Sequence, residues 1–121
     1  MRIVQLKGLA IVVHAEGRLN REMLLDQVKD IVVQAAQDYP VSVYLFGSWA
    51  RNEEKRSSDI DIAIDSEEEG ISPSLLNTLR DAVEESLIPY RVDIVDLVKA
   101  DPAIRQKVQK EGILWRDYKS V

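Results

Sequence analysis

The stretch Val41-Ser-Val-Tyr-Leu-Phe-Gly-Ser-Trp-Ala-Arg51, followed by Ser58-Asp-Ile-Asp-Ile62, carries most of the information in this chain. Its apolar run from Val41 to Phe46 predicts a strand that ends in a tight turn at Gly47-Ser48. Beyond the turn we expect a short helix through Arg51 and then a polar loop over residues 52–58. The alternation of isoleucine and aspartate that follows predicts a second strand with one apolar and one acidic face.

A turn between a strand and a helix can bind an anion. Backbone N–H groups and the Ser48 hydroxyl would point at a phosphate, the helix dipole would assist, and Gly47 would let the backbone approach closely. No Gly-Lys-Ser/Thr follows, so this is not a Walker A loop. Arg51 could contact phosphate or pair with a carboxylate, and Trp49 could stack on a base or pack on its neighbours. The candidate nucleotide-binding residues are therefore Gly47, Ser48 and Arg51.

Asp59 and Asp61 are candidate metal ligands. Residues two apart on a strand project from the same face, about 7 Å apart at Cα, so both carboxylates could reach one metal or a close metal pair. A hard cation such as Mg²⁺ takes a few carboxylates and completes its shell with phosphate oxygens and water. A lone Asp-x-Asp is more often a half-exposed strand or loop. An EF-hand fits poorly, because its sixth loop position would be Ile64 instead of glycine.

A third carboxylate would complete a two-metal site. Asp93 lies within an otherwise apolar strand expected over residues 90–97, where an aspartate is costly unless it is paired or metal-bound. Asp96 is its competitor, although its place near the strand's end also suits a solvent-facing side chain. Spacing favours Asp93 and leaves Asp96 open.

Hydrophobic periodicity and capping residues predict the remaining elements of one α/β domain over residues 1–121. These are a strand or hairpin within residues 1–19, a helix from an Asn20 cap to about Asp38, a helix capped by Ser72 or Ser74, a helix over residues 101–111 closed by Gly112, and an edge strand over residues 113–115.

Composition narrows the classes of function. The chain has 121 residues and no cysteine, which excludes disulfides, zinc–thiolate sites and thiol catalysis, and one histidine, His14, which excludes a His-rich metal site. No apolar run is long enough for a signal-peptide core or a membrane span, so we expect a cytoplasmic protein without membrane association.

Charge points away from DNA. The chain carries 21 acidic and 16 basic residues, a net charge of −5, whereas nonspecific nucleic-acid binding needs a basic face. The balance suits an enzyme that attracts Mg²⁺ or a basic protein partner. A basic set near the C-terminus is interpreted as a solvated helix face: Arg105, Lys107, Lys110, Arg116 and Lys119.

Taken together, the three motifs resemble those of the minimal nucleotidyltransferases of the DNA polymerase β-like superfamily. The family pattern is Gly-Ser-x-Ala-Arg-Gly, a variable loop, Ser-Asp-Ile-Asp-Leu and an aspartate on a later strand, and the resemblance runs from about residue 20 to residue 115. It implies a small nucleotidyltransferase fold with a mixed β-sheet flanked by helices. This chain departs from the pattern at Asn52, where the family has glycine. Asparagine tolerates left-handed backbone geometry, so we expect the turn to survive.

The resemblance also implies a role for each matched residue. Gly47 and Ser48 would hold the β- and γ-phosphates of ATP, and Asp59 and Asp61 would ligate two Mg²⁺ ions. Asp93 would be the third carboxylate, which shares in the metal site and activates the attacking hydroxyl. Two-metal chemistry would then transfer AMP from ATP to an acceptor.

The acceptor that the resemblance implies is another protein, namely a tyrosine of a HEPN-domain RNase toxin, with this chain as the antitoxin. Two alternatives stay open: an antitoxin that neutralises the toxin by binding alone, and a small-molecule nucleotidyltransferase of the aminoglycoside-modifying type. Whether the chain forms a homo-oligomer is also left open.

Overall fold

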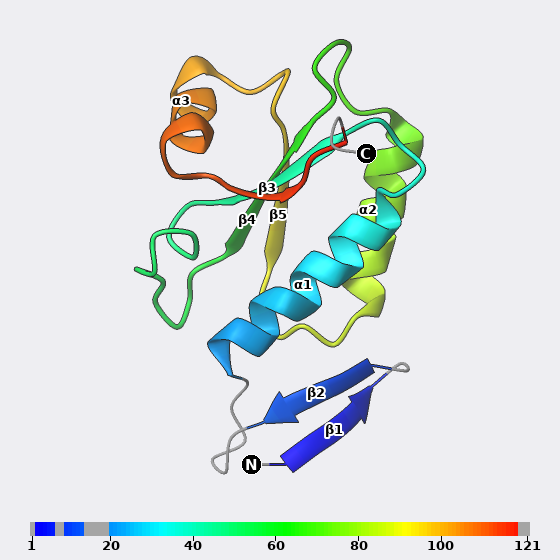
Figure 1. Ribbon diagram of the computed structural model, residues 1–121, viewed down its shortest axis with the longest axis vertical. Helices are drawn as coiled ribbons and strands as arrows, with labels where there is room; N and C mark the ends of the chain where they lie inside the picture. Colours follow the sequence, from blue (N-terminus) through cyan, green and yellow to red (C-terminus); the bar gives the residue numbers. More distant parts are fainter. Residues whose placement is uncertain (1, 7–8, 14–19, 119–121) are drawn as a thin grey trace.

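The computed structural model describes residues 2–6, 9–13 and 20–118, with side chains from residue 20 onward (Figure 1). His14 and Lys119 lie outside the described residues. The elements follow one another as β1 (Arg2–Leu6), β2 (Leu9–Val13), α1 (Arg21–Ala35), β3 (Ser42–Phe46), β4 (Ile60–Asp65), α2 (Pro73–Glu85), β5 (Val92–Asp96), α3 (Pro102–Glu111) and β6 (Ile113–Arg116).

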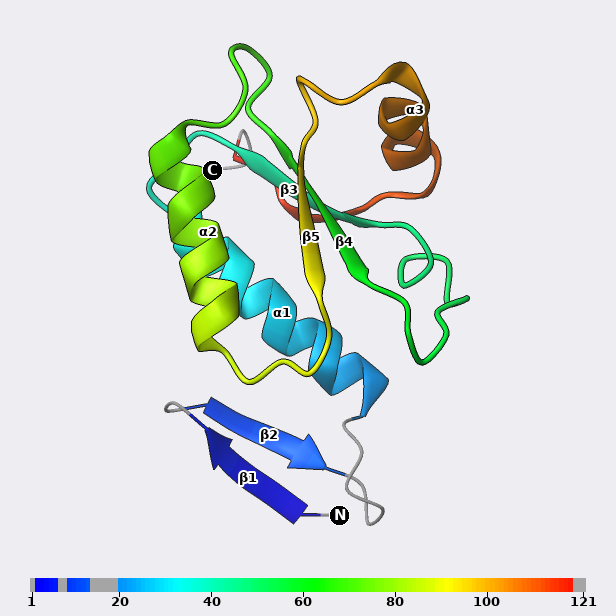
Figure 2. The same ribbon diagram turned by 180° about the vertical axis from the view of Figure 1, so that it is seen from behind.

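Four strands form a mixed sheet in the order β5-β4-β3-β6. β4 and β5 run parallel, whereas β3 is antiparallel to both β4 and β6. The expected α/β fold with a mixed sheet is confirmed. β1 and β2 pair as a separate antiparallel hairpin, as expected for the start of the chain, and β2 lies beside α1 (Figures 1 and 2).

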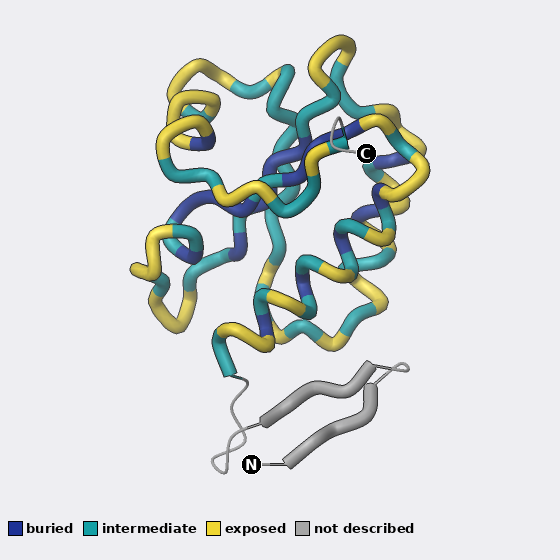
Figure 3. The backbone as a smooth tube through the Cα atoms, in the orientation of Figure 1, coloured by how far each residue is buried: buried dark blue, intermediate teal, exposed yellow. Residues whose placement is uncertain are grey.

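Helices cover both faces of the sheet. α1 and α2 pack together on one face and α3 lies on the other (Figure 2). On β4, the side chains of Ile60, Ile62 and Ile64 are fully buried in the large core beneath α1 and α2. Ala63 lies on the opposite face in a small cluster with residues of β3 and α3. The buried centre of the sheet is visible in Figure 3. This alternation places Asp61 on the face of α3.

Capping residues explain where the helices begin. The Asn20 side chain accepts hydrogen bonds from two N–H groups of the first turn of α1, as predicted. Of the two candidates for α2, Ser72 is the cap and Ser74 is not. Asp101 caps α3, and Gly112 closes it. No helix in the described part of the chain is long and apolar enough to cross a membrane.

Several boundaries differ from the expectation. α1 ends at Ala35, and the chain continues as turns in which the Tyr39 N–H bonds to the Ala36 carbonyl. A helix as far as Tyr39 is disfavoured, because the residue before Pro40 avoids helical geometry. β5 is shorter than residues 90–97, since only Val92–Asp96 pairs with β4.

The expectation of a short helix after Gly47 was wrong. Residues 48–52 form overlapping turns, in which the N–H groups of Ala50 and Arg51 share the Gly47 carbonyl at 3.1 and 3.2 Å. The helical geometry stops because Asn52 adopts a left-handed conformation with φ 59°. Asparagine therefore occupies the position of the family's glycine without loss of the turn, as expected.

Candidate active site

The turn after β3 touches the acidic face of β4. Gly47 has a φ of +77°, and a Cβ at this position would collide with the carboxylate of Asp61. The contact follows from the register, because Phe46, the last residue of β3, is paired with Asp61. Only glycine combines this backbone angle with this close approach. The candidate phosphate-binding turn thus lies directly against Asp61, one of the candidate metal ligands.

The second strand pair brings in the third carboxylate. Asp61 of β4 is directly opposite Asp93 of β5 in the parallel register, and such strands lie about 4.8 Å apart. Asp59 precedes Asp61 by two residues, immediately before β4 begins. The side chains of Asp59 and Asp93 are 42% and 47% exposed, so both can be reached by a ligand. All three predicted carboxylates lie at one end of neighbouring strands.

The carboxylates affect one another electrostatically. The pKa of Asp61 is raised, first by burial and then by the negative charges of Asp93 and Asp59. The positive charges of Lys107 and Arg51 act in the opposite direction. Lys107 of α3 is thus near enough to act on Asp61, although the sequence placed it in a solvated basic set. A cation bound among these carboxylates would relieve the repulsion.

One arginine already lies among them. The Arg91 guanidinium approaches Asp59 at 4.0 Å and Asp93 at 3.5 Å, and its side chain is 75% exposed. Sequence reasoning missed this residue. The available signal was its spacing, because Arg91 precedes Asp93 by two residues in an extended segment.

The donor set suits a hard divalent cation. Carboxylate oxygens are the ligands that Mg²⁺ takes in proteins, and burial together with the charges of Asp93 and Asp59 raises the pKa of Asp61 beside the Gly47 turn. Within residues 20–118 no three acidic or histidine side chains are already gathered closely enough to form a metal group. Asp59, Asp61 and Asp93 would hold the ion, and this assignment stays a prediction.

Asp96, the other candidate for the third carboxylate, binds backbone N–H groups instead. Its carboxylate accepts hydrogen bonds from the backbone N–H groups of Ile71 at 3.0 Å and Val98 at 3.2 Å, and it stands opposite Ile64 in the register. Of the two candidates, Asp93 is therefore the one beside Asp61. The expected burial of Asp93 was wrong, however, because β5 is an edge strand and its residues are only partly buried.

Arg51 forms the ion pair that the sequence left as an alternative to phosphate binding. Its Nε donates to Glu53 at 2.7 Å, and its Nη1 donates to both carboxylate oxygens of Glu111 at 2.9 and 3.1 Å. The hydrogen bonds to Glu111 and Glu53 raise its pKa. Arg51 thus ties the turn after β3 to the last residue of α3.

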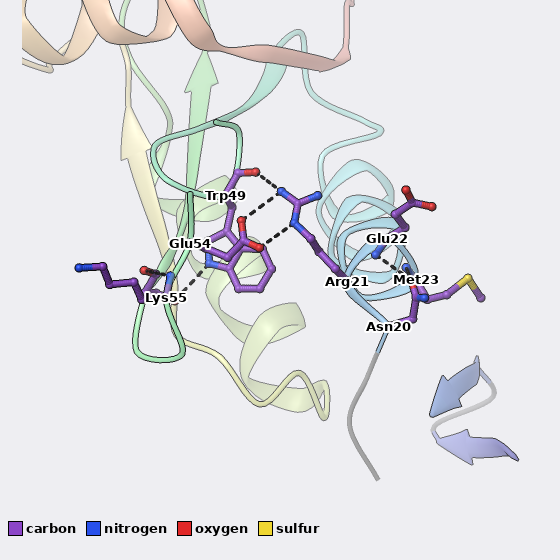
Figure 4. Close-up of polar contacts among 8 residues, drawn as sticks. Asn20, Arg21, Glu22, Met23, Trp49, Glu54 and Lys55 are labelled. Atoms are coloured by element: carbon purple, nitrogen blue, oxygen red, sulfur yellow. Dashed lines mark hydrogen bonds and ion pairs between the residues drawn. The ribbon is translucent and has the colours of Figure 1, made fainter. Parts of the chain in front are cut away.

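Trp49 packs in the core, and this excludes it as an exposed platform for a base. Its side chain is buried, its ring meets Tyr90 edge-to-face at 5.1 Å, and its indole N–H donates to the Ser58 carbonyl at 3.2 Å. Arg21 lies over the same ring, donates to the Trp49 carbonyl and forms a bidentate pair with Glu54 (Figure 4). These contacts, which the sequence did not reveal, fix the loop between the two motifs.

The mixed α/β fold is that of a nucleotidyltransferase. The chain belongs to the family "Polymerase beta, Nucleotidyltransferase", whose pattern matches residues 26–118. The match includes all four strands of the mixed sheet and all candidate site residues.

Named relatives agree with this assignment. The chain is 36% identical to the "Probable protein adenylyltransferase MntA" of Haemophilus influenzae, over 74% of this chain and 76% of the relative. A solved structure described as a "putative minimal nucleotidyltransferase" is 31% identical, with a TM-score of 0.61 over 78% of this chain and 95% of the other. A crystal structure of a toxin–antitoxin with AMP-PNP contains a chain that is 26% identical, with a TM-score of 0.56 over 73% and 72% of the two chains.

Proposed function

We propose that this chain is a Mg²⁺-dependent protein adenylyltransferase that transfers AMP from ATP to a tyrosine of a HEPN-domain RNase toxin and thereby acts as its antitoxin. The observation that carries the proposal is the contact between the Gly47 turn and Asp61, with Asp93 on the neighbouring strand. It brings a phosphate-binding backbone and paired carboxylates to one place, which is what transfer of a nucleoside monophosphate requires.

In this proposal the residues divide the work. Backbone N–H groups at Gly47 and Ser48, with the Ser48 hydroxyl, bind the terminal phosphates. Asp59, Asp61 and Asp93 would hold two Mg²⁺ ions, whose chemistry is to neutralise charge on the triphosphate and on the departing pyrophosphate. Asp93 accepts the proton of the attacking tyrosine hydroxyl. A new bond forms between the tyrosine oxygen and the α-phosphorus of ATP. The bond between the α-phosphorus and the oxygen that bridges the α- and β-phosphates breaks, and pyrophosphate leaves.

Arg51 joins the phosphate-binding set when it exchanges a carboxylate partner for the triphosphate. The Glu53 side chain is 63% exposed, so Arg51 can leave it without stranding a buried charge, whereas its pair with Glu111, which is 21% exposed, can stay in place. The Lys107 ammonium, which already acts on Asp61, lies on the same side and would add to the attraction.

The protein acceptor and the antitoxin role rest on similarity. The Haemophilus relative is named for protein adenylylation, and the solved toxin–antitoxin contains a nucleotide analogue of ATP. The tyrosine target and the HEPN partner come from the motif resemblance. We place the reaction in the cytoplasm, where ATP, Mg²⁺ and an RNase toxin would meet.

Replacement of Asp59 and Asp61 distinguishes AMP transfer from neutralisation of the toxin by binding alone. Asp59→Asn with Asp61→Asn keeps side-chain size while it removes the charge that holds Mg²⁺. The HEPN protein encoded beside this chain's gene is incubated with ATP, Mg²⁺ and each variant, and its intact mass is measured. Wild type should add the mass of AMP in a reaction that EDTA stops, and the double variant should add none and should fail to protect cells.

A matched control removes the same number of charges elsewhere. Asp26→Asn with Asp30→Asn changes two exposed residues of α1 and should leave transfer intact. If the folded Asp59/Asp61 double variant still protects cells fully, the chain acts by binding alone. If the neighbouring gene encodes no HEPN protein, the assigned acceptor is wrong.

A further inference from the structure

Arg91 is held in a fixed place at the entrance to β5. Its backbone carbonyl accepts a hydrogen bond from the Ile60 N–H at 2.9 Å, which ties it to the start of β4. Because this bond is made by the backbone, it does not depend on the side chain. From this anchor the guanidinium group extends between Asp59 and Asp93, the two more exposed carboxylates of the candidate metal site.

The contacts of Arg91 are long compared with the structural ion pairs of this protein. They measure 4.0 and 3.5 Å, whereas Arg21 meets Glu54 at 2.7 Å and Arg51 meets Glu53 at 2.7 Å. The Arg91 side chain is also 75% exposed, so water screens its attraction to either carboxylate. Such a cation is attracted by the cluster as a whole and is released easily.

The surroundings offer Arg91 a second position. It lines an open cleft of about 430 Å³ between β5 and the end of α2, next to Asp93. Glu84 and Arg80 of α2 line the same cleft, so its wall carries charges of both signs. The exposed Arg91 side chain therefore has open space beside Asp93 into which it can turn without entering the apolar core.

We propose that Arg91 is a displaceable cation that neutralises Asp59 and Asp93 in the metal-free protein and competes with the divalent metal for them. Binding of the ion moves the guanidinium away from them, toward the open cleft between β5 and α2. The inference rests on the metal site of the proposed function, but it concerns metal binding without nucleotide or acceptor. It makes Arg91 a residue that tunes metal affinity and not a catalytic residue.

Direct titration with Mn²⁺ alone tests this competition. Wild type, Arg91→Gln and Arg91→Lys are titrated by calorimetry without nucleotide, and their melting temperatures are measured in EDTA and in Mn²⁺. Because an exposed pair contributes up to about 1 kcal/mol, Arg91→Gln should bind Mn²⁺ about two- to fivefold more tightly than wild type. It should also melt at a lower temperature in EDTA, where the carboxylates lose their counter-charge. Lysine keeps the charge but lacks the planar guanidinium group that can span two carboxylates. The Mn²⁺ affinity of Arg91→Lys should therefore lie between those of wild type and Arg91→Gln.

Arg105→Gln is the matched control, because it removes the same charge from an exposed residue of α3 that lines a different cleft. It should change Mn²⁺ affinity less than Arg91→Gln does. Equal or weaker Mn²⁺ binding by Arg91→Gln, an equal gain in the control, or no Mn²⁺ binding in any of the proteins would overturn the proposal. If the wild-type chain does not transfer AMP to a HEPN protein, the proposed acceptor is wrong. The Mn²⁺ titration would still test the role of Arg91, because it uses neither nucleotide nor acceptor.

Discussion

The Gly47 α-carbon lies against the carboxylate of Asp61, so close that no side chain fits between them. The contact joins the end of β3 to the beginning of β4, the two central strands of the sheet. It follows from the pairing of Phe46 with Asp61 and requires a residue without a Cβ at position 47. The candidate active site is therefore sensitive to a single methyl group.

Gly47→Ala should lower both stability and nucleotide affinity. An alanine at φ +77° costs about 1–2 kcal/mol, and its Cβ would push the Asp61 carboxylate out of place. We expect Mg²⁺-ATP affinity to fall on the order of tenfold, which corresponds to about 1.4 kcal/mol. Urea denaturation measures the first effect and calorimetry with Mg²⁺-ATP the second.

Gly70→Ala is the matched control for this change. Gly70 has a similar φ of +87°, but its neighbours are Asp96 and Lys99 instead of the candidate site. It should lose comparable stability and keep its ATP affinity. If both variants lose ATP affinity equally, backbone strain alone explains the loss and the contact with Asp61 has no special role.

Asp61→Asn should stabilise the metal-free protein at neutral pH. The raised pKa of Asp61 means that the folded state disfavours its charged form, because of burial and the nearby charges of Asp93 and Asp59. The gain should be on the order of 0.5 kcal/mol after allowance for solvent screening. Thermal denaturation in EDTA at pH 7 measures it.

The raised pKa of Asp61 also predicts how the stability difference between Asp61→Asn and wild type changes with pH. A carboxyl group with a raised folded pKa favours folding below its unfolded pKa of about 4 and loses that contribution as the pH rises through the folded pKa. The advantage of Asp61→Asn should therefore grow from pH 4 to pH 7. An Asp61→Asn protein that is less stable than wild type in EDTA at pH 7 would show that the carboxylate is a structural acceptor instead.

Glu54→Gln should destabilise the protein by about 1–2 kcal/mol at pH 7, because it weakens the half-buried bidentate pair with Arg21 that holds the turn at Trp49. The Arg21 hydrogen bonds lower the pKa of Glu54. A lowered pKa adds stability above the unfolded value of about 4.3 that is lost as the pH falls through the folded pKa. The difference between wild type and Glu54→Gln in urea denaturation should therefore stay constant from pH 7 to about pH 5 and shrink as the pH is lowered below about 4.

Glu53→Gln provides the comparison at the neighbouring position. Its side chain is 63% exposed and pairs with the exposed Arg51, so its removal should change stability by less than about 0.5 kcal/mol. Equal losses from both glutamate variants would contradict the special place given to the Arg21–Glu54 pair.

The sequence by itself determined the elements and the identity of the motifs. Alternation along Ile60–Asp65 separates a core face from an acidic face, because successive side chains on a strand point in opposite directions. The caps at Asn20 and Asp101 are equally local, since each side chain binds N–H groups within three residues. Such short-range rules hold whatever the rest of the chain does.

Only the tertiary structure decided which distant residues meet. The register of β4 with β5 placed Asp93 beside Asp61, whereas the Asp96 carboxylate accepts a hydrogen bond from the Ile71 N–H. The spacing of these residues in the sequence had left open which of the two aspartates joins Asp61. Strand order made β5 an edge and left Asp93 half exposed. The partners of Arg91 and Arg51 depend in the same way on strand pairing and on the packing of α3. Ion pairs between residues far apart in the chain follow from the fold, because side-chain charge alone does not specify which opposite charge will lie within reach.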